Sequence, residues 1–267
     1  TPSVSITASA STICTGNPLT FTATAVNGGT VPAYQWQVDG SNAGTNSNSF
    51  TTSTLTNGQV VTVILTSNES CVTSATATSN SITVTVEDNA VLTQTSGPAS
   101  QTVCINNAIT AIVYTIGGTG NNASATGLPA GVTGTYNAGI FTLSGSPSVA
   151  GVYNFSVTSS GTCANAPAIA GTITVDDNAT INLSSAINTN NQTVCINTAI
   201  VNITYNLGGG ATGAVVSGLA GTGLNSNVSG NLVTISGSPN AAAVINYTVQ
   251  TTGPCLTASA TGTITVN

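Results

Sequence analysis

The chain of 267 residues contains no lysine, arginine, histidine or methionine, and its six acidic residues give it a net charge of −6. Nucleic-acid binding draws on lysine and arginine to neutralise phosphates, so we expect no nucleic-acid partner. The same absence argues against attraction to anionic lipid headgroups. General acid–base and nucleophilic catalysis also lose their usual participants, since no domain holds a paired carboxylate in its interior. We therefore expect no enzyme, no catalytic residue and no cofactor.

Long apolar segments are also missing, although 40% of the residues are hydrophobic and the mean hydropathy is +0.32. No stretch approaches the roughly 18 apolar residues of a membrane-spanning helix, so we expect no direct membrane insertion. Apolar residues alternate instead with Thr, Ser and Asn, with the period of half-buried strands, as at residues 19–25, 34–38, 60–65 and 82–86. Turn signals such as Asn57-Gly58 separate these segments. The pattern predicts an all-β fold.

An internal repeat sets the domain organisation. The sequence QTVCIN at residues 101–106 returns at residues 192–197, 91 positions later, and SGSP at 144–147 returns at 236–239. A period near 90 residues is too long for a solenoid and suits a β-sandwich domain. We therefore predict three tandem Ig-like β-sandwich domains, stapled by disulfides, at residues 1–86, 87–175 and 176–267. The second and third are close relatives of each other and distant from the first.

The six cysteines fall two to a module. Within the modules the two cysteines are separated by 57, 59 and 60 residues, and the chain has neither a CxxC motif nor a histidine, which favours disulfides over a metal site. Six reduced, buried thiols are the alternative. Pairing within each module repeats identically along an array, so we predict bonds of Cys14 with Cys71, Cys104 with Cys163, and Cys195 with Cys255. Each bond would close a loop of about 60 residues and contribute about 4 kcal/mol to stability in the chain-entropy model.

Charge is concentrated at the two domain junctions, which carry Glu87, Asp88, Asp176 and Asp177. Carboxylates with nearby carbonyls are ligands that Ca²⁺ prefers, and a bound ion would stiffen a linker. A solvated acidic linker with Asn in a turn is the other interpretation. The sequence leaves both open.

The only tryptophan, Trp36, lies on a segment where Tyr34 and Trp36 share one strand face and Gln35 and Gln37 share the other. Buried aromatic rings commonly nucleate sandwich cores, whereas an exposed ring could stack on a sugar. We predict that Trp36 is a core residue.

Several segments carry a family resemblance: residues 12–14, 19–25, 34–40 and 66–67 in the first module, and residues 101–106, 127–132 and 144–147 with their counterparts in the other two. The first module resembles the PKD-like and Ig-like repeats of very large secreted surface proteins of Bacteroidota, and the other two are similar to Ig-like repeats that run in tandem through the same proteins, including adhesins linked to gliding motility. The resemblance implies a β-sandwich array in an extracellular or cell-surface location.

Together these features predict a structural or adhesive stalk segment of an extracellular bacterial surface protein or fibre. Its expected partners are other copies or further repeats of the same surface protein, and surface glycans. Two alternatives stay open. One is an array of carbohydrate-binding modules. The other is a filament subunit joined by strand addition, because charge-poor sheet edges lack the usual protection against a neighbour's strand.

Overall fold

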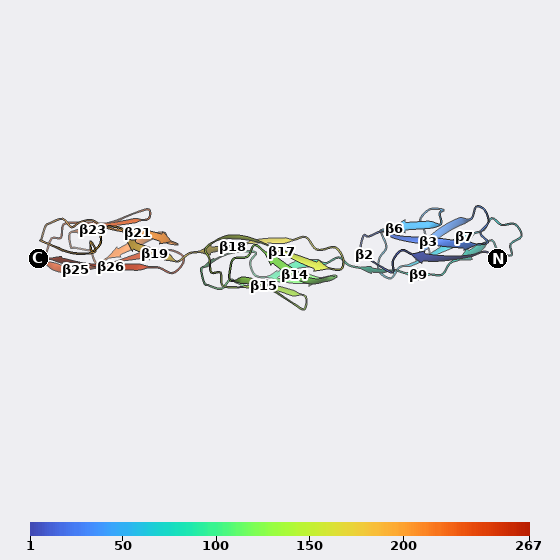
Figure 1. Ribbon diagram of the computed structural model, residues 1–267, viewed down its shortest axis with the longest axis horizontal. Helices are drawn as coiled ribbons and strands as arrows, with labels where there is room; N and C mark the ends of the chain where they lie inside the picture. The colour runs from blue at the N-terminus through green and yellow to red at the C-terminus, as the bar shows by residue number, and fades with distance from the viewer.

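The computed structural model describes residues 1–267 and contains 26 strands and no helix. Three β-sandwiches follow one another in a line, so that the molecule is a rod with the N-terminus at one end and the C-terminus at the other (Figure 1). No helix in it could cross a membrane. The prediction of three tandem Ig-like β-sandwiches is confirmed.

The first module packs a three-stranded sheet, in the order β1-β3-β6, against a sheet in the order β5-β4-β7-β8 in which β9 also pairs with β7. A short parallel pair, β2 with β10, completes it. Apolar and polar residues alternate along these strands. In β3, Leu19, Phe21 and Ala23 are buried, while the threonines between them are half-buried or exposed. The strands are β1 (Ser3–Ala8), β2 (Thr12–Cys14), β3 (Leu19–Val26), β4 (Ala33–Val38), β5 (Ser41–Ala43), β6 (Ser49–Thr52), β7 (Val60–Thr66), β8 (Thr76–Thr78), β9 (Ile82–Thr83) and β10 (Thr85–Glu87).

The second module has two four-stranded sheets, in the orders β11-β13-β16-β15 and β12-β18-β17-β14. In the latter, β12 runs parallel to the last strand of the module, β18, while the other pairs are antiparallel. The strands are β11 (Val91–Ser96), β12 (Ser100–Cys104), β13 (Ile112–Gly117), β14 (Gly120–Thr126), β15 (Val132–Asn137), β16 (Ile140–Gly145), β17 (Gly151–Gly161) and β18 (Ile169–Asp176).

The third module repeats this topology strand for strand, with sheets in the orders β19-β21-β24-β23 and β20-β26-β25-β22. Here β20 is parallel to the last strand, β26. The strands are β19 (Ala179–Leu183), β20 (Asn191–Val194), β21 (Ile203–Gly209), β22 (Gly213–Ser217), β23 (Leu224–Ser229), β24 (Leu232–Gly237), β25 (Ala243–Thr252) and β26 (Ser259–Val266).

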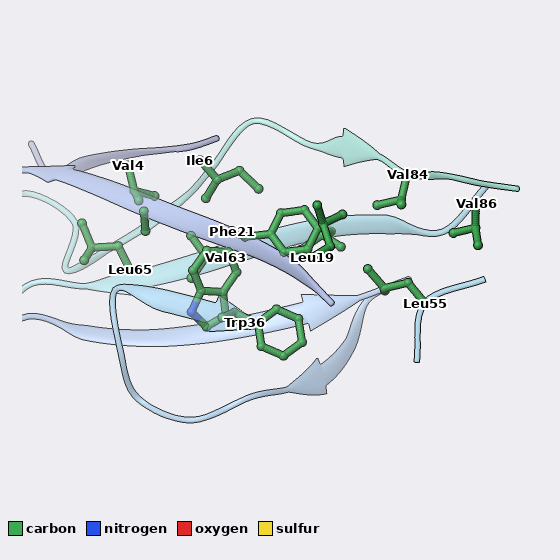
Figure 2. Close-up of a cluster of buried hydrophobic side chains, with 13 residues drawn as sticks. Val4, Ile6, Leu19, Phe21, Trp36, Leu55, Val63, Leu65, Val84 and Val86 are labelled. Atoms are coloured by element: carbon green, nitrogen blue, oxygen red, sulfur yellow. The ribbon is translucent and has the colours of Figure 1, made fainter. Parts of the chain in front are cut away.

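Each module has its own hydrophobic core. In the first, Trp36 is 0% exposed, and its ring centroid lies 6.3 Å from that of Phe21 and 5.7 Å from that of Phe50 (Figure 2). The indole Nε1 donates a hydrogen bond to the carbonyl of Ser47 at 2.8 Å, so the one polar atom of the ring is satisfied. The prediction that Trp36 is a core residue is confirmed.

One buried site at which the two related modules differ contains a pair of tyrosines in the third module. In the third module the hydroxyls of Tyr205 and Tyr247 are hydrogen-bonded at 3.0 Å, and burial together with this contact raises the pKa of Tyr247 far above 10.0. In the second module the position of Tyr247 is taken by Phe155, each opposite a glycine of the last strand. The hydroxyl of Tyr114 is therefore buried without a partner.

Candidate functional site: the covalent junctions between modules

The first junction joins the end of module one to a loop of module two. Cys14 ends β2, where it lies in register with Glu87 at the end of β10, and the carbonyl of Glu87 accepts a hydrogen bond from the amide of Thr15 at 2.9 Å. Cys163 lies in the loop between β17 and β18 of the next module. The two cysteines form a disulfide with their Cα atoms 5.5 Å apart.

The second junction repeats this arrangement. Cys104 ends β12 in register with Asp176 at the end of β18, and the carbonyl of Asp176 accepts a hydrogen bond from the amide of Ile105 at 2.8 Å. Cys255 lies in the loop between β25 and β26, and the Cα atoms of Cys104 and Cys255 are again 5.5 Å apart. The disulfides thus bond the first cysteine of one module to the second cysteine of the next.

This connectivity corrects the predicted pairing of Cys14 with Cys71, Cys104 with Cys163 and Cys195 with Cys255. In module two, Cys104 lies at the end of β18 and Cys163 lies in the loop before β18 begins. The eight residues of that strand rise about 25 Å in all. A disulfide requires Cα atoms no more than about 7 Å apart, so Cys104 and Cys163 cannot bond to each other.

The linker residues reinforce each disulfide. The amide of Ala90 donates to the carbonyl of Ala164 at 2.9 Å, and the amide of Ala164 donates to Oδ1 of Asn89 at 3.3 Å. At the second junction, Ala179 and Asn178 bond in the same way to Leu256, at 2.9 and 3.4 Å. The linker is therefore held to the residue that directly follows the second cysteine of the downstream module.

The acidic residues of the junctions are engaged in local hydrogen bonds. Oε2 of Glu87 accepts from the hydroxyl of Thr162 at 3.2 Å, across the first junction. The carbonyl of Asp88 accepts from the hydroxyl of Thr119 at 2.8 Å. Oδ1 of Asp177 accepts from the amide of Asn178 at 2.8 Å, while Asp176 contributes its carbonyl to the strand pairing. Nowhere do three or more His, Cys, Asp or Glu side chains gather as metal ligands, and the choice between a calcium site and a solvated acidic linker is left to calcium titration.

Two cysteines have no bond within the chain. Cys71, in the loop between β7 and β8, and Cys195, which directly follows β20, are both exposed free thiols. The sequence predicted a disulfide for each, and no sequence signal distinguishes them from the four bonded cysteines.

A hollow of about 410 Å³ lies at the second junction, lined by residues 104–107 and 254–256 together with Asn178. Its lining consists of the disulfide, three asparagine amides and the apolar side chains of Ile105, Pro254 and Leu256, with no charged group. General acid–base chemistry requires a titratable side chain in reach of a substrate, and this hollow offers none.

No protein-family model and no curated protein sequence matches the chain. Solved structures do. The I-band fragment I67–I69 of titin is 10% identical with a TM-score of 0.65, over 96% of this chain and 95% of that one. An E-to-A variant of the same fragment, also 10% identical, gives a TM-score of 0.63 over the same shares. The Escherichia coli adhesin FdeC is 18% identical, with a TM-score of 0.41 over 99% of this chain and 96% of that one. The titin likeness shows the fold: the chain is an array of three tandem Ig-like domains.

Proposed function

We propose that the chain is a stalk segment of an extracellular bacterial surface adhesin or fibre, which extends a binding region without performing catalysis. The observation that carries this proposal is the pair of disulfides between successive modules. Tandem domains joined by short linkers ordinarily move relative to one another. Here each junction has a disulfide beside the linker. The second covalent connection restricts bending at the junction, so the three modules form a stiff rod.

The same bonds support an extracellular location. Disulfides persist in oxidising compartments and are rare where thiols are kept reduced, so two interdomain disulfides support an extracellular setting. The resemblance of the repeats to those of Bacteroidota surface adhesins, including the gliding-motility type, supports a cell-surface origin. The absence of lysine and arginine removes every trypsin cleavage site, which suits an exposed fibre.

The two alternatives gain no support from the contacts. A carbohydrate-binding function would need an exposed aromatic platform, and Trp36, the best stacking residue, has no exposed surface. A filament joined by strand addition would contain a sheet in which one strand comes from a neighbouring module. Every sheet is instead built from strands of a single module.

Small-angle X-ray scattering tests the stalk. The reference is the Cys71→Ser, Cys195→Ser variant, which removes the free thiols and keeps both interdomain disulfides. We expect the maximum dimension of this oxidised variant to match a straight rod. Adding Cys14→Ser and Cys104→Ser should broaden the distance distribution and lower the mean radius of gyration, since each junction then bends about its linker. Identical curves for the two variants would contradict the proposal.

A further inference from the structure

At the end of module three that lies away from module two, Cys195 has the same surroundings as Cys14 and Cys104, the cysteines through which modules one and two bond to the next module; we call this arrangement, in which the first cysteine lies beside the end of the last strand, a half-junction. Cys195 lies opposite Asn267, and the carbonyl of Asn267 accepts a hydrogen bond from the amide of Ile196 at 3.0 Å. This is the bond that Thr15 makes with Glu87 and Ile105 makes with Asp176. The next turn also matches, because the residue two positions after each of these cysteines has a positive φ, 84° at Gly16, 65° at Asn106 and 59° at Asn197.

The other end of the rod presents the complementary half. Cys71 lies in the loop that follows β7, as Cys163 follows β17 and Cys255 follows β25. The hydroxyl of Thr73 in that loop lies 3.5 Å from that of Thr1, so the loop is beside the N-terminus.

The two unbonded cysteines are more exposed than the four bonded ones. Cys14, Cys104, Cys163 and Cys255 are half-buried, whereas the free Cys71 and Cys195 are exposed. The residue after each of these cysteines shows the same difference in exposure. Ile196, which follows Cys195, is 45% exposed, whereas its counterpart Ile105 is half-buried beside the second disulfide. A module seated on Cys195 would cover this apolar side chain as module three covers Ile105.

We propose that a second copy of this chain is the partner, and that copies join head to tail through a disulfide between Cys195 of one copy and Cys71 of the next. The inference rests on the proposed stalk function and names its partner. Within the chain, a cysteine in the Cys195 position bonds only to a cysteine in the Cys71 position of a following module. The chain carries one of each unbonded: Cys71 lies in the loop beside the N-terminus and Cys195 lies beside the C-terminal Asn267. Because the two termini lie at opposite ends of the rod (Figure 1), these cysteines cannot bond to each other.

The bond forms by thiol–disulfide exchange with a low-molecular-weight disulfide such as oxidised glutathione. The Cys195 thiolate attacks one sulfur of glutathione disulfide and releases one glutathione. The Cys71 thiolate of the next copy then attacks the Cys195 sulfur of the mixed disulfide and releases the second glutathione. The two cysteine thiols together lose two electrons, one glutathione disulfide is reduced to two glutathione thiolates, and these take up the two protons that leave the cysteines.

The test mixes two full-length variants, isotope-labelled Cys71→Ser and unlabelled Cys195→Ser, in a buffer of reduced and oxidised glutathione. Each variant retains one half-junction, so the proposed bond can form only between unlike chains. We expect a covalent heterodimer in at least about fivefold excess over the two homodimers together, measured by non-reducing electrophoresis and intact mass, because exchange selects the best-matched pair of thiols. The unsubstituted chain should give a ladder of higher oligomers.

Three results would overturn the inference: equal amounts of heterodimer and total homodimer, which random oxidation gives; an excess of either homodimer; or monomers capped by glutathione. The variant lacking both Cys71 and Cys195 should remain monomeric, and its rod shape in solution reports on the stalk alone. A flexible monomer would count against the proposed function, whereas a rigid monomer without heterodimer would count only against the head-to-tail bond.

Discussion

The staggered disulfides change how the chain carries force, and reduction of the two bonds is the perturbation that reveals this. In the oxidised chain the shortest covalent route from Thr1 to Asn267 does not follow the backbone. It runs to Cys14, crosses to Cys163, returns along module two to Cys104, and crosses to Cys255. Most of modules one and three lies outside this route and bears no load once the route is taut.

The structure gives the size of the effect. The route has 13 residue steps before the first disulfide, 59 between the two and 12 after the second, 84 in all, against 266 along the backbone. At about 3.5 Å per residue, the fully stretched oxidised chain reaches about 300 Å, including its two bridges, and the reduced chain about 930 Å. Reduction should therefore lengthen the final extension about threefold.

Single-molecule force spectroscopy measures this directly. The chain is tethered by its two ends in the Cys71→Ser, Cys195→Ser background and pulled until the tether breaks, with and without a reductant. The final contour length should follow the two values above, and a variant lacking only Cys14 should give an intermediate length. An oxidised contour length close to that of the reduced chain would refute the assigned connectivity.

Three other predictions concern the cores and the junctions. Tyr205→Phe leaves the hydroxyl of Tyr247 buried without a partner and should destabilise module three by about 1–3 kcal/mol, whereas Tyr114→Phe removes an unpaired hydroxyl and should leave module two equally or more stable; hydrogen exchange in β21 and β13 reports each module, and equal losses would contradict the assignment. Because burial raises the folded-state pKa of Tyr247 above 10.0, its contribution to stability is complete below pH 10.0 and is lost as the pH rises from 10.0 toward the folded-state pKa, so Tyr247→Phe should flatten the alkaline part of a plot of unfolding free energy against pH. Calcium titration should raise the thermal midpoint little, since Ca²⁺ needs about six to eight oxygen ligands and each junction offers two carboxylates; a large rise at micromolar calcium would establish an ion site.

Most of the fold could be predicted from the sequence, but the disulfide pairing at the junctions could not. The QTVCIN repeat and the two-residue alternation predicted three β-sandwiches, and the strand faces predicted the burial of Trp36. These succeed because they depend on local pattern and on a module size that one core can support.

The disulfide pairing failed for a physical reason. A bond from each module to the next repeats as regularly as one within each module, with separations of 149 and 151 residues here, so periodicity cannot choose between them. The choice depends on which end of the sandwich each cysteine occupies. That is set by the parallel pairing of β12 with β18, a long-range contact that local alternation does not encode.

Disulfide mapping tests the central claim most directly. The oxidised chain is digested with pepsin at acidic pH, where thiol exchange is suppressed and the lack of lysine and arginine is no obstacle, and the linked peptides are identified by mass spectrometry. Linkage of Cys14 to Cys163 and of Cys104 to Cys255 is the predicted result. Peptides that link Cys14 to Cys71, or Cys104 to Cys163, would contradict it and remove the covalent junctions on which the stalk depends.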